Sequence, residues 1–167
     1  MQGPSHGYDL HQRLSAELGN VWHLSQSQVY SVLKRLEQRG DISARKRLQG
    51  KLPARQELHL TAAGKKRFAQ WMEGEAGTSA RTVRLEFLTR LYFANLLMPG
   101  QKGRIYAAQA QEITNTIRRL RTALNQVPAN QPYNRMSLDL RLRQMEVIRE
   151  WLREIRMTFQ IGHKGRR

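Results

Sequence analysis

The chain has 167 residues, 29 of them Lys or Arg and 13 Asp or Glu, so its net charge is +16. Its length fits one domain or two small ones, and its 40% hydrophobic content suffices for a core. The lack of cysteine excludes disulfides and thiolate sites, and the positive charge favours nucleic acid first and an anionic membrane second as partner. With neither a signal peptide nor an apolar run long enough to cross a bilayer, we expect a soluble cytoplasmic protein and no membrane partner.

Two helices are predicted near the start of the chain. The first runs from Tyr8 to Leu18, where leucines recur at helical spacing, and Gly19-Asn20 ends it. The second begins after Ser25, which stands three residues before Gln28, the spacing of a capping box. It stops at Gly40, because glycine readily adopts the left-handed conformation of a helix end. Its predicted apolar stripe consists of Val29, Val32, Leu33 and Leu36.

After this second helix the period of the apolar residues changes from 3.6 to 2, which is typical of strands. Ile42–Leu48 and Gln56–Leu60 are predicted to pair as a hairpin across the connection Gln49–Ala54, which contains a Gly and a Pro. Helix, turn, helix and basic hairpin follow each other as in a winged helix-turn-helix. In that fold the second helix enters the major groove and the hairpin, or wing, lies along the DNA backbone.

The exposed sides of the second helix carry groups that can contact base edges and phosphates. Gln28 is the leading candidate for adenine, because an amide donates and accepts at once, while Tyr30 and Lys34 are assigned to phosphates. Arg35 is equally suited to a surface pair with Glu37. Alone, such a helix is more often an ordinary solvated one, and the neighbouring basic hairpin favours DNA binding. The predicted DNA-binding residues are Ser27, Gln28, Tyr30, Ser31, Lys34, Arg35, Arg47, Lys51 and Arg55.

Short motifs in this half of the chain resemble the PadR family of bacterial transcriptional regulators. In order, they are Gly3-Pro4, Gly7-Tyr8-Asp9-Leu10, Gln28-Val29-Tyr30, Leu33-Lys34-Arg35-Leu36-Glu37, Gly40 and Leu60-Thr61-Ala62-Ala63-Gly64. The resemblance is dense over about the first eighty residues and looser beyond them. It implies a dimeric winged-helix repressor whose C-terminal helices form the dimer, often with an effector such as a phenolic acid or a hydrophobic drug.

The sequence departs from the family pattern in two places. PadR-like chains normally begin with another helix before the Gly-Pro turn, so we expect that first helix to be missing here. The predicted wing tip reads Gly50-Lys51-Leu52-Pro53-Ala54-Arg55, where the family tends to have a Gly-Arg-Pro-Pro-Arg-like sequence. The family's wing contacts therefore transfer to this chain only approximately.

The second half of the chain is predicted to be helical. Thr61 caps a third helix, and the small, polar stretch Gly74–Ala80 marks a domain boundary. We therefore expect a winged-helix domain over residues 1–75, a helical dimerisation domain over residues 81–160 and a basic tail over residues 161–167. The expected fold class is mainly α with a small β-hairpin wing.

Three helical segments are predicted beyond the boundary. Thr82–Met98 is apolar on most sides, which indicates a helix enclosed by others, and Pro99-Gly100 ends it. Two further helices carry heptad seams and form an antiparallel hairpin across the loop Val127–Asn134. Because a hairpin with exposed seams cannot bury both apolar faces alone, we predict a homodimer. The residues assigned to dimerisation are Tyr106, Ile113, Ile117, Leu120, Leu142, Met145, Ile148, Leu152 and Ile155.

Two features of this half allow two interpretations each. A set of aromatic residues forms either part of the core or a pocket for a small aromatic effector: Trp71, Phe87, Tyr92, Phe93 and Trp151. Residues 1–80 hold 12 Lys and Arg and 7 Asp and Glu, a net +5, whereas residues 81–167 hold 17 and 6, a net +11. The larger excess is either solvated helix surface or a second contact with flanking DNA.

No pattern of catalytic chemistry occurs in the sequence. The five histidines lack metal-site spacing, and there is no Walker loop, dinucleotide fingerprint or nucleophile elbow, so we expect no enzyme, no metal and no cofactor. The predicted function is a sequence-specific DNA-binding transcriptional regulator, a dimeric repressor released by a small aromatic effector. The alternatives are a nonspecific architectural or RNA-associated protein and a protein-interaction module with a vestigial winged helix.

Overall fold

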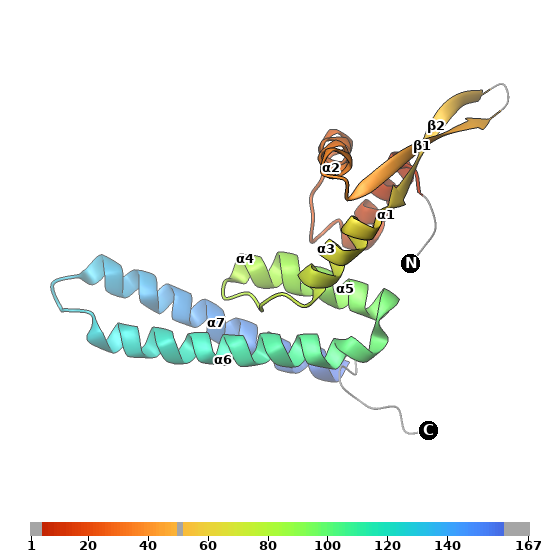
Figure 1. The fold of residues 1–167 in the computed structure, drawn as a ribbon. Helices are drawn as coiled ribbons and strands as arrows, with labels where there is room; N and C mark the ends of the chain where they lie inside the picture. The colour runs from red at the N-terminus through yellow and green to blue at the C-terminus, as the bar shows by residue number, and fades with distance from the viewer. Residues whose placement is uncertain (1–4, 50–51, 159–167) are drawn as a thin grey trace, which may run out of the picture. The chain divides into compact units, whose positions relative to one another are not determined.

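The computed structural model describes residues 5–49 and 52–158, and the chain divides into two compact units, residues 1–74 and 75–167. Figure 1 shows the helices and the single hairpin of the described residues, which confirm a mainly helical fold with a small β-hairpin. The first unit contains α1 (Gly7–Leu18), α2 (Gln26–Gln38), β1 (Ile42–Gln49), β2 (Leu52–Leu60) and α3 (Ala62–Met72). The second contains α4 (Ala80–Thr82), the π-helical turn η1 (Val83–Phe87), α5 (Leu88–Leu97), the 3-10 turn η2 (Pro99–Gln101), α6 (Lys102–Gln126) and α7 (Pro132–Thr158).

The predicted capping box starts α2. The Ser25 hydroxyl accepts a hydrogen bond from the Gln28 backbone N–H at 3.3 Å, and the Gln28 side-chain oxygen accepts one from the Ser25 N–H at 2.8 Å. At the other end Gly40 has a φ of 73°, the left-handed conformation expected of it. Val29 is buried, but Val32 is 37% exposed. Val32 thus lies at the outer edge of the predicted stripe and is more exposed than the prediction implied.

The wing is longer than the sequence suggested. β1 and β2 pair antiparallel, with Ile42 opposite Leu60, and β2 begins at Leu52 rather than at Gln56. The prediction of a six-residue connection was wrong because Pro53 does not stop a strand that has a partner on one side only. Ser5 adds a backbone bridge on β2, donating to the Leu58 carbonyl at 3.4 Å and accepting from its N–H at 3.0 Å.

A buried carboxylate joins α2, the wing and α3. Asp41 is 2% exposed, and its two oxygens pair with Arg39 at 3.2 Å and with Arg67 at 3.0 Å. The Asp41 carbonyl accepts hydrogen bonds from the N–H and the hydroxyl of Thr61, which in turn caps α3 by accepting from the Gly64 N–H at 3.0 Å. Two cations on one buried carboxylate offset the cost of its desolvation. This junction fixes the ends of the three elements relative to one another.

In the second unit α4, η1 and α5 form one helical row that packs on the hairpin of α6 and α7 (Figure 1). The predicted continuous helix is thus present, but it contains a π turn over Val83–Phe87. A π turn shifts the hydrogen-bond register by one residue. The Thr89 hydroxyl donates to the Leu85 carbonyl at 2.5 Å and so gives that oxygen a partner.

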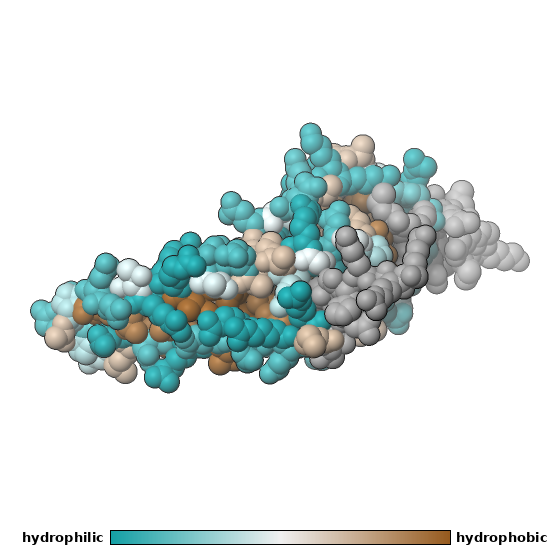
Figure 2. Space-filling view, turned by 90° about the horizontal axis from the view of Figure 1, so that it is seen from below, coloured by the Kyte–Doolittle hydropathy of each residue, from teal (hydrophilic) through white to brown (hydrophobic). Residues whose placement is uncertain are grey.

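Helices α6 and α7 lie side by side in opposite directions, as the two seams predicted (Figure 1). Ile113 and Leu152 are 0% and 1% exposed, and the buried Tyr106 hydroxyl donates to the Leu152 carbonyl at 2.9 Å. Figure 2 shows apolar side chains gathered in a line along the helical unit, bordered by hydrophilic residues. The seams therefore form the core of this unit.

The segment after α3 is attached to the second unit. The side chain of Gln109, 2% exposed, donates to the Gly77 carbonyl at 2.7 Å and accepts from the Gly77 N–H at 3.3 Å. Arg90, also buried, donates to the Glu75 carbonyl at 2.8 Å and pairs with Glu86 at 3.3 Å. Side chains of α5 and α6 thus hold the backbone that leads into α4.

None of the helices in residues 5–49 and 52–158 is both long enough and apolar enough to cross a membrane.

Candidate nucleic-acid interface

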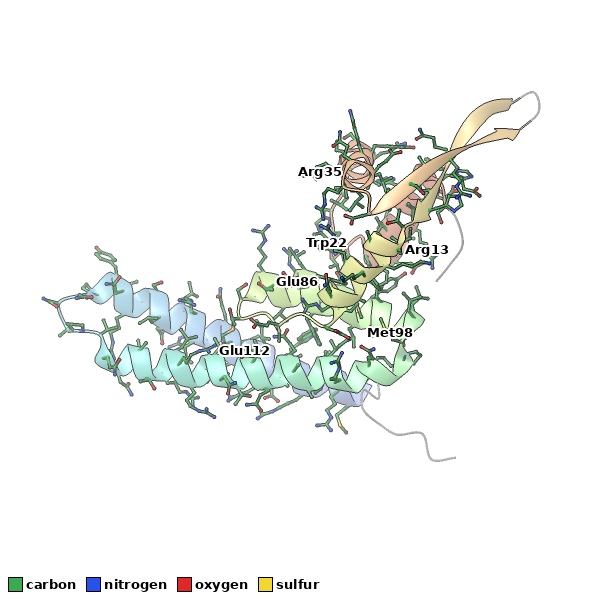
Figure 3. All side chains as sticks on the ribbon, in the orientation of Figure 1. Arg13, Trp22, Arg35, Glu86, Met98 and Glu112 are labelled. Atoms are coloured by element: carbon green, nitrogen blue, oxygen red, sulfur yellow. The ribbon has the colours of Figure 1, made fainter. Side chains whose placement is uncertain are left out.

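The outer face of α2 presents the side chains predicted to contact DNA. Because successive helical residues are about 100° apart, Ser27, Ser31 and Lys34 share the side opposite the buried Val29. Arg35, labelled in Figure 3, extends from the same helix. All six predicted α2 residues, including Gln28 and Tyr30, are exposed. The structure therefore brings hydroxyl, amide, phenol and cationic groups together on one solvated helix.

Gln28 has a structural task that competes with contact to a base. Its side-chain oxygen accepts the Ser25 N–H in the capping box, which leaves the amide donor exposed. Adenine is bound through one donor and one acceptor of the same amide. A bidentate contact would require the Gln28 oxygen to leave the cap. The adjacent Ser27 hydroxyl also has a local partner, the Ser25 hydroxyl at 3.0 Å.

Tyr30 packs against the start of α1. A Cβ built on Gly7 would lie 2.8 Å from the Tyr30 ring and 3.3 Å from Leu33, so only glycine allows this approach. The ring remains 47% exposed. The absence of a side chain at position 7 thus sets where the Tyr30 phenol stands on the helix.

Arg35 is available for an external partner. In the described part of the chain it makes no ion pair, and in particular none with Glu37, its predicted alternative partner. Lys34 likewise has no carboxylate partner among the described residues. Exposed cations of this kind are the groups that neutralise backbone phosphates.

Basic residues occupy facing positions of the wing. In the backbone register Arg47 is opposite Arg55, and Arg45 is opposite Glu57. Since residues alternate between faces along a strand, position 45 lies on the face away from the one that buries Ile42. Arg45 is exposed and was missed in the sequence prediction, although the period-2 pattern around it indicated the same face. The predicted contact Lys51 lies outside the described residues.

The predicted effector-pocket residues fall in both units. Trp71 lies on α3 of the first unit; in the second, Phe87 and Trp151 stack edge to face at 6.2 Å, and Tyr92 and Phe93 at 5.2 Å. Phe87 is 2% exposed and is part of the core. None of these residues lines either of the two cavities described for the chain, one between α1 and α2 and one beside α6.

The residues assigned to dimerisation mostly pack within the chain. Seven of them are buried in the single chain, while Ile148 and Ile155 are half-buried. They are Tyr106, Ile113, Ile117, Leu120, Leu142, Met145 and Leu152. The two helices thus cover each other's seams, and a partner chain would meet a different face.

A second apolar row on α7 remains exposed. Tyr133, Met136, Leu140 and Val147 are 83%, 66%, 59% and 69% exposed, and we call them the outer α7 stripe. They recur at spacings of three, four and seven residues, a heptad pattern in another phase of the same helix. The pattern of the stripe is harder to recognise in the sequence because the same helix carries the stronger seam. Several exposed apolar side chains on one helix face are typical of interaction surfaces.

Part of the large positive charge of the second unit is neutralised locally. Four arginines form surface ion pairs with carboxylates: Arg119 with Glu112, Arg121 with Glu146, Arg143 with Asp139 and Arg153 with Glu150. Others have no carboxylate partner among the described residues, and these include Arg118, Arg135 and Arg141. No group of three His, Asp or Glu side chains in the described ranges could hold a metal ion.

Part of the chain is similar to a known family. Residues 1–70 match the model of the transcriptional regulator PadR-like family. The negative transcriptional regulator PadR of Bacillus subtilis (strain 168) is 30% identical over 111 residues, which are 66% of this chain and 60% of that protein. The chain therefore spans less than two thirds of this relative's length.

Two solved structures are similar. The crystal structure of Bacillus subtilis PadR in complex with operator DNA has 24% identity and a TM-score of 0.44, over 92% of this chain and 90% of that one. A protein of Streptococcus mutans UA159 has 21% identity and a TM-score of 0.42, over 90% of this chain and 89% of that one.

Proposed function

Because residues 1–70 match the model of the PadR-like family of transcriptional regulators, we propose that the protein belongs to this family and binds operator DNA sequence-specifically as a repressor. The observation that carries the proposal is the outer face of α2, where exposed polar and cationic side chains stand next to a wing that contains Arg45, Arg47 and Arg55. The name of the Bacillus subtilis relative, a negative transcriptional regulator, supports the direction of the effect.

In the proposed complex α2 lies in the major groove. Ser31 and Arg35 face base edges, where an arginine binds guanine through two parallel hydrogen bonds. Lys34, together with Arg45, Arg47 and Arg55 of the wing, contacts phosphates and fixes the position of α2 on the duplex. Gln28 donates from its free amide nitrogen while its oxygen remains in the cap.

The protein acts as a homodimer in this proposal. The outer α7 stripe supports this, because four large apolar side chains on one helix face remain in water in the single chain. Arg143 lies in the middle of the stripe and donates to Asp139 at 2.8 Å. That hydrogen bond raises the pKa of the Arg143 guanidinium, so its charge persists. Two copies related by a two-fold axis would match a palindromic operator.

Release by a small aromatic effector is the last part of the proposal. Of the aromatic residues predicted to line its pocket, Trp151 is half-buried and stacks on Phe87 at the junction of η1 and α7. An aromatic acid that binds there would quench tryptophan fluorescence. The measurement is a titration with a hydroxycinnamate; no quenching at millimolar concentration would exclude this class of effector.

The experiment that tests DNA recognition is selection from a pool of random duplexes at near-physiological salt. Enrichment of a two-fold symmetric motif is the expected result. Tight binding without enrichment would instead indicate a nonspecific architectural protein, and no binding even at low salt would indicate a protein-interaction module. Both outcomes contradict the proposal.

A matched pair of lysine variants then tests the contact assignment. Lys34→Ala should weaken binding to all sequences alike and reduce the slope of log K against log salt by about 1.8, because the dimer loses two phosphate contacts. Lys65→Ala removes an exposed lysine of α3, outside the proposed interface, and should leave the slope unchanged. Equal effects of the two substitutions would show that the α2 assignment is wrong.

A further inference from the structure

The first unit contains a cavity of about 800 Å³ bounded by α1, α2 and β2. Its lining includes His6, Tyr8, Asp9, Tyr30, Leu33 and Glu37. The volume is in the range of pockets for small organic molecules. Tyr30 and Lys34, which also lines the cavity, are predicted DNA contacts, whereas His6, Tyr8, Asp9 and Glu37 have no place in the proposed interface.

Two phenol rings and two leucines, Leu33 and Leu58, form the apolar part of the lining. Tyr8 and Tyr30 are 50% and 47% exposed, and Leu33 is half-buried between them and the core. The lack of a side chain on Gly7 allows the Tyr30 ring to approach the start of α1. Aromatic faces attract organic cations through the ring quadrupole as well as through apolar contact.

The charged part of the lining is mainly acidic, in a protein with 29 Lys and Arg against 13 Asp and Glu. Asp9 and Glu37 have no cationic partner among the described residues, whereas seven other described carboxylates pair with arginines. These seven are Glu17, Asp41, Glu86, Glu112, Asp139, Glu146 and Glu150. Two carboxylates without such a partner thus line the same cavity.

The remaining polar groups do not outweigh the negative charge of the lining. Lys34 is the one cation of the lining, and it is exposed on α2. His6 is already engaged, since its Nδ1 bonds the Gln56 carbonyl oxygen at 2.8 Å. The lining thus offers two carboxylates and two phenol rings against one ammonium group.

We propose that this cavity binds a small organic cation with an aromatic body. The cationic group would lie between the carboxylates of Asp9 and Glu37, and the aromatic body would stack on Tyr30 over Leu33. Because Tyr30 and Glu37 belong to α2, the ligand contacts the helix that the proposed function places on DNA. Binding to the free protein does not depend on that function.

Three probes of the same size and different charge test the proposal: benzamidine (cationic), benzamide (neutral) and benzoate (anionic). Amide chemical shifts of the isotope-labelled full chain are followed by NMR without DNA. We expect saturable chemical-shift changes at Tyr8 and Leu33 with benzamidine. Benzamide and benzoate should bind at least about fivefold more weakly. Tighter binding of benzoate, or no saturation by 20 mM benzamidine (about 50 times a 0.4 mM Kd), would overturn the proposal.

Substitutions in the lining locate the site. Glu37→Gln and Asp9→Asn should each weaken benzamidine binding about threefold to tenfold, since each removes one charge contact while keeping the side-chain shape. Glu73→Gln, which neutralises an exposed carboxylate at the end of α3, is the matched control and should leave affinity unchanged. If Asp9→Asn fails to fold, the affinity of Glu37→Gln for benzamidine alone tests the assignment. An unchanged affinity in Glu37→Gln would overturn the assignment.

The result is separable from the DNA experiment. Selection from random duplexes needs no benzamidine, and the NMR titration needs no duplex. If the protein binds benzamidine but selects no motif, the cavity stands and the proposed function fails. If it selects a motif but does not bind benzamidine, the proposed function stands and the proposal for the cavity fails.

Discussion

The α-carbon of Gly64 lies so close to the backbone carbonyl oxygen of Asp41 that a Cβ at position 64 would overlap that oxygen. The same carbonyl accepts two hydrogen bonds from Thr61, so it cannot easily move away. Gly64→Ala should therefore lower the free energy of unfolding by about 1–3 kcal/mol. Urea unfolding followed by circular dichroism measures this change.

The control for this substitution is Gly100→Ala. Nothing lies within 4 Å of a Cβ at that position, so alanine should be neutral or slightly stabilising there. Equal effects of the two substitutions would show that helix propensity, rather than the contact between Gly64 and Asp41, determines the result.

Two substitutions of Gln28 separate its cap from its proposed contact with DNA. Gln28→Glu keeps an oxygen for the Ser25 N–H, so stability should be unchanged, but it removes the donor and adds a negative charge at the groove. Gln28→Ala loses the cap bond and should cost about 0.5–1 kcal/mol of stability. We expect Gln28→Glu to weaken operator binding more than Gln28→Ala does. Operator binding no weaker in Gln28→Glu would place Gln28 outside the interface.

The outer α7 stripe and the seam should respond differently to substitution. Leu140→Lys places a charge on an exposed position and should shift the chain from dimer to monomer in light scattering with little loss of helix. Ile113→Ala empties a fully buried position and should cost about 2–5 kcal/mol in unfolding. A dimer that persists in Leu140→Lys would move the interface to another face.

The side chain of Gln109 should protect the segment between the units from proteolysis. Gln109→Ala leaves the N–H and the carbonyl of Gly77 without their partners, which we expect to cost about 1–3 kcal/mol. Cleavage near residues 75–79 should become faster in limited proteolysis. Gln111→Ala, an exposed glutamine on the same helix, is the control and should be cleaved like the parent chain.

Local chemistry made several features of the fold predictable from the sequence. The cap at Ser25, the cap at Thr61 and the left-handed Gly40 depend on residues within a few positions of each other. The ion pair of Asp41 with Arg67 and the bonds of Gln109 join residues far apart in sequence, and no pattern in the sequence indicates them. The same holds for the cavity lined by Asp9 and Glu37.

Periodicity shows that a residue is buried but does not show which surface covers it. Ile113 and Leu152 were predicted from their heptad spacing as dimer contacts, and the structure buries both within the single chain. The outer stripe, with Leu140 and Val147, has the same spacing in a weaker form. Only the packing of α6 on α7 distinguishes the two rows.

The bonds made by Gln109 and Arg90 also constrain the backbone between α3 and α4. Glu73 and Gly74 still donate backbone hydrogen bonds to the end of α3, whereas Glu75 and Gly77 are held by side chains of the second unit. Between these attachments lies a single peptide bond. The backbone of this segment is therefore set from both sides, its first residues by the end of α3 and its last by the side chains of Gln109 and Arg90.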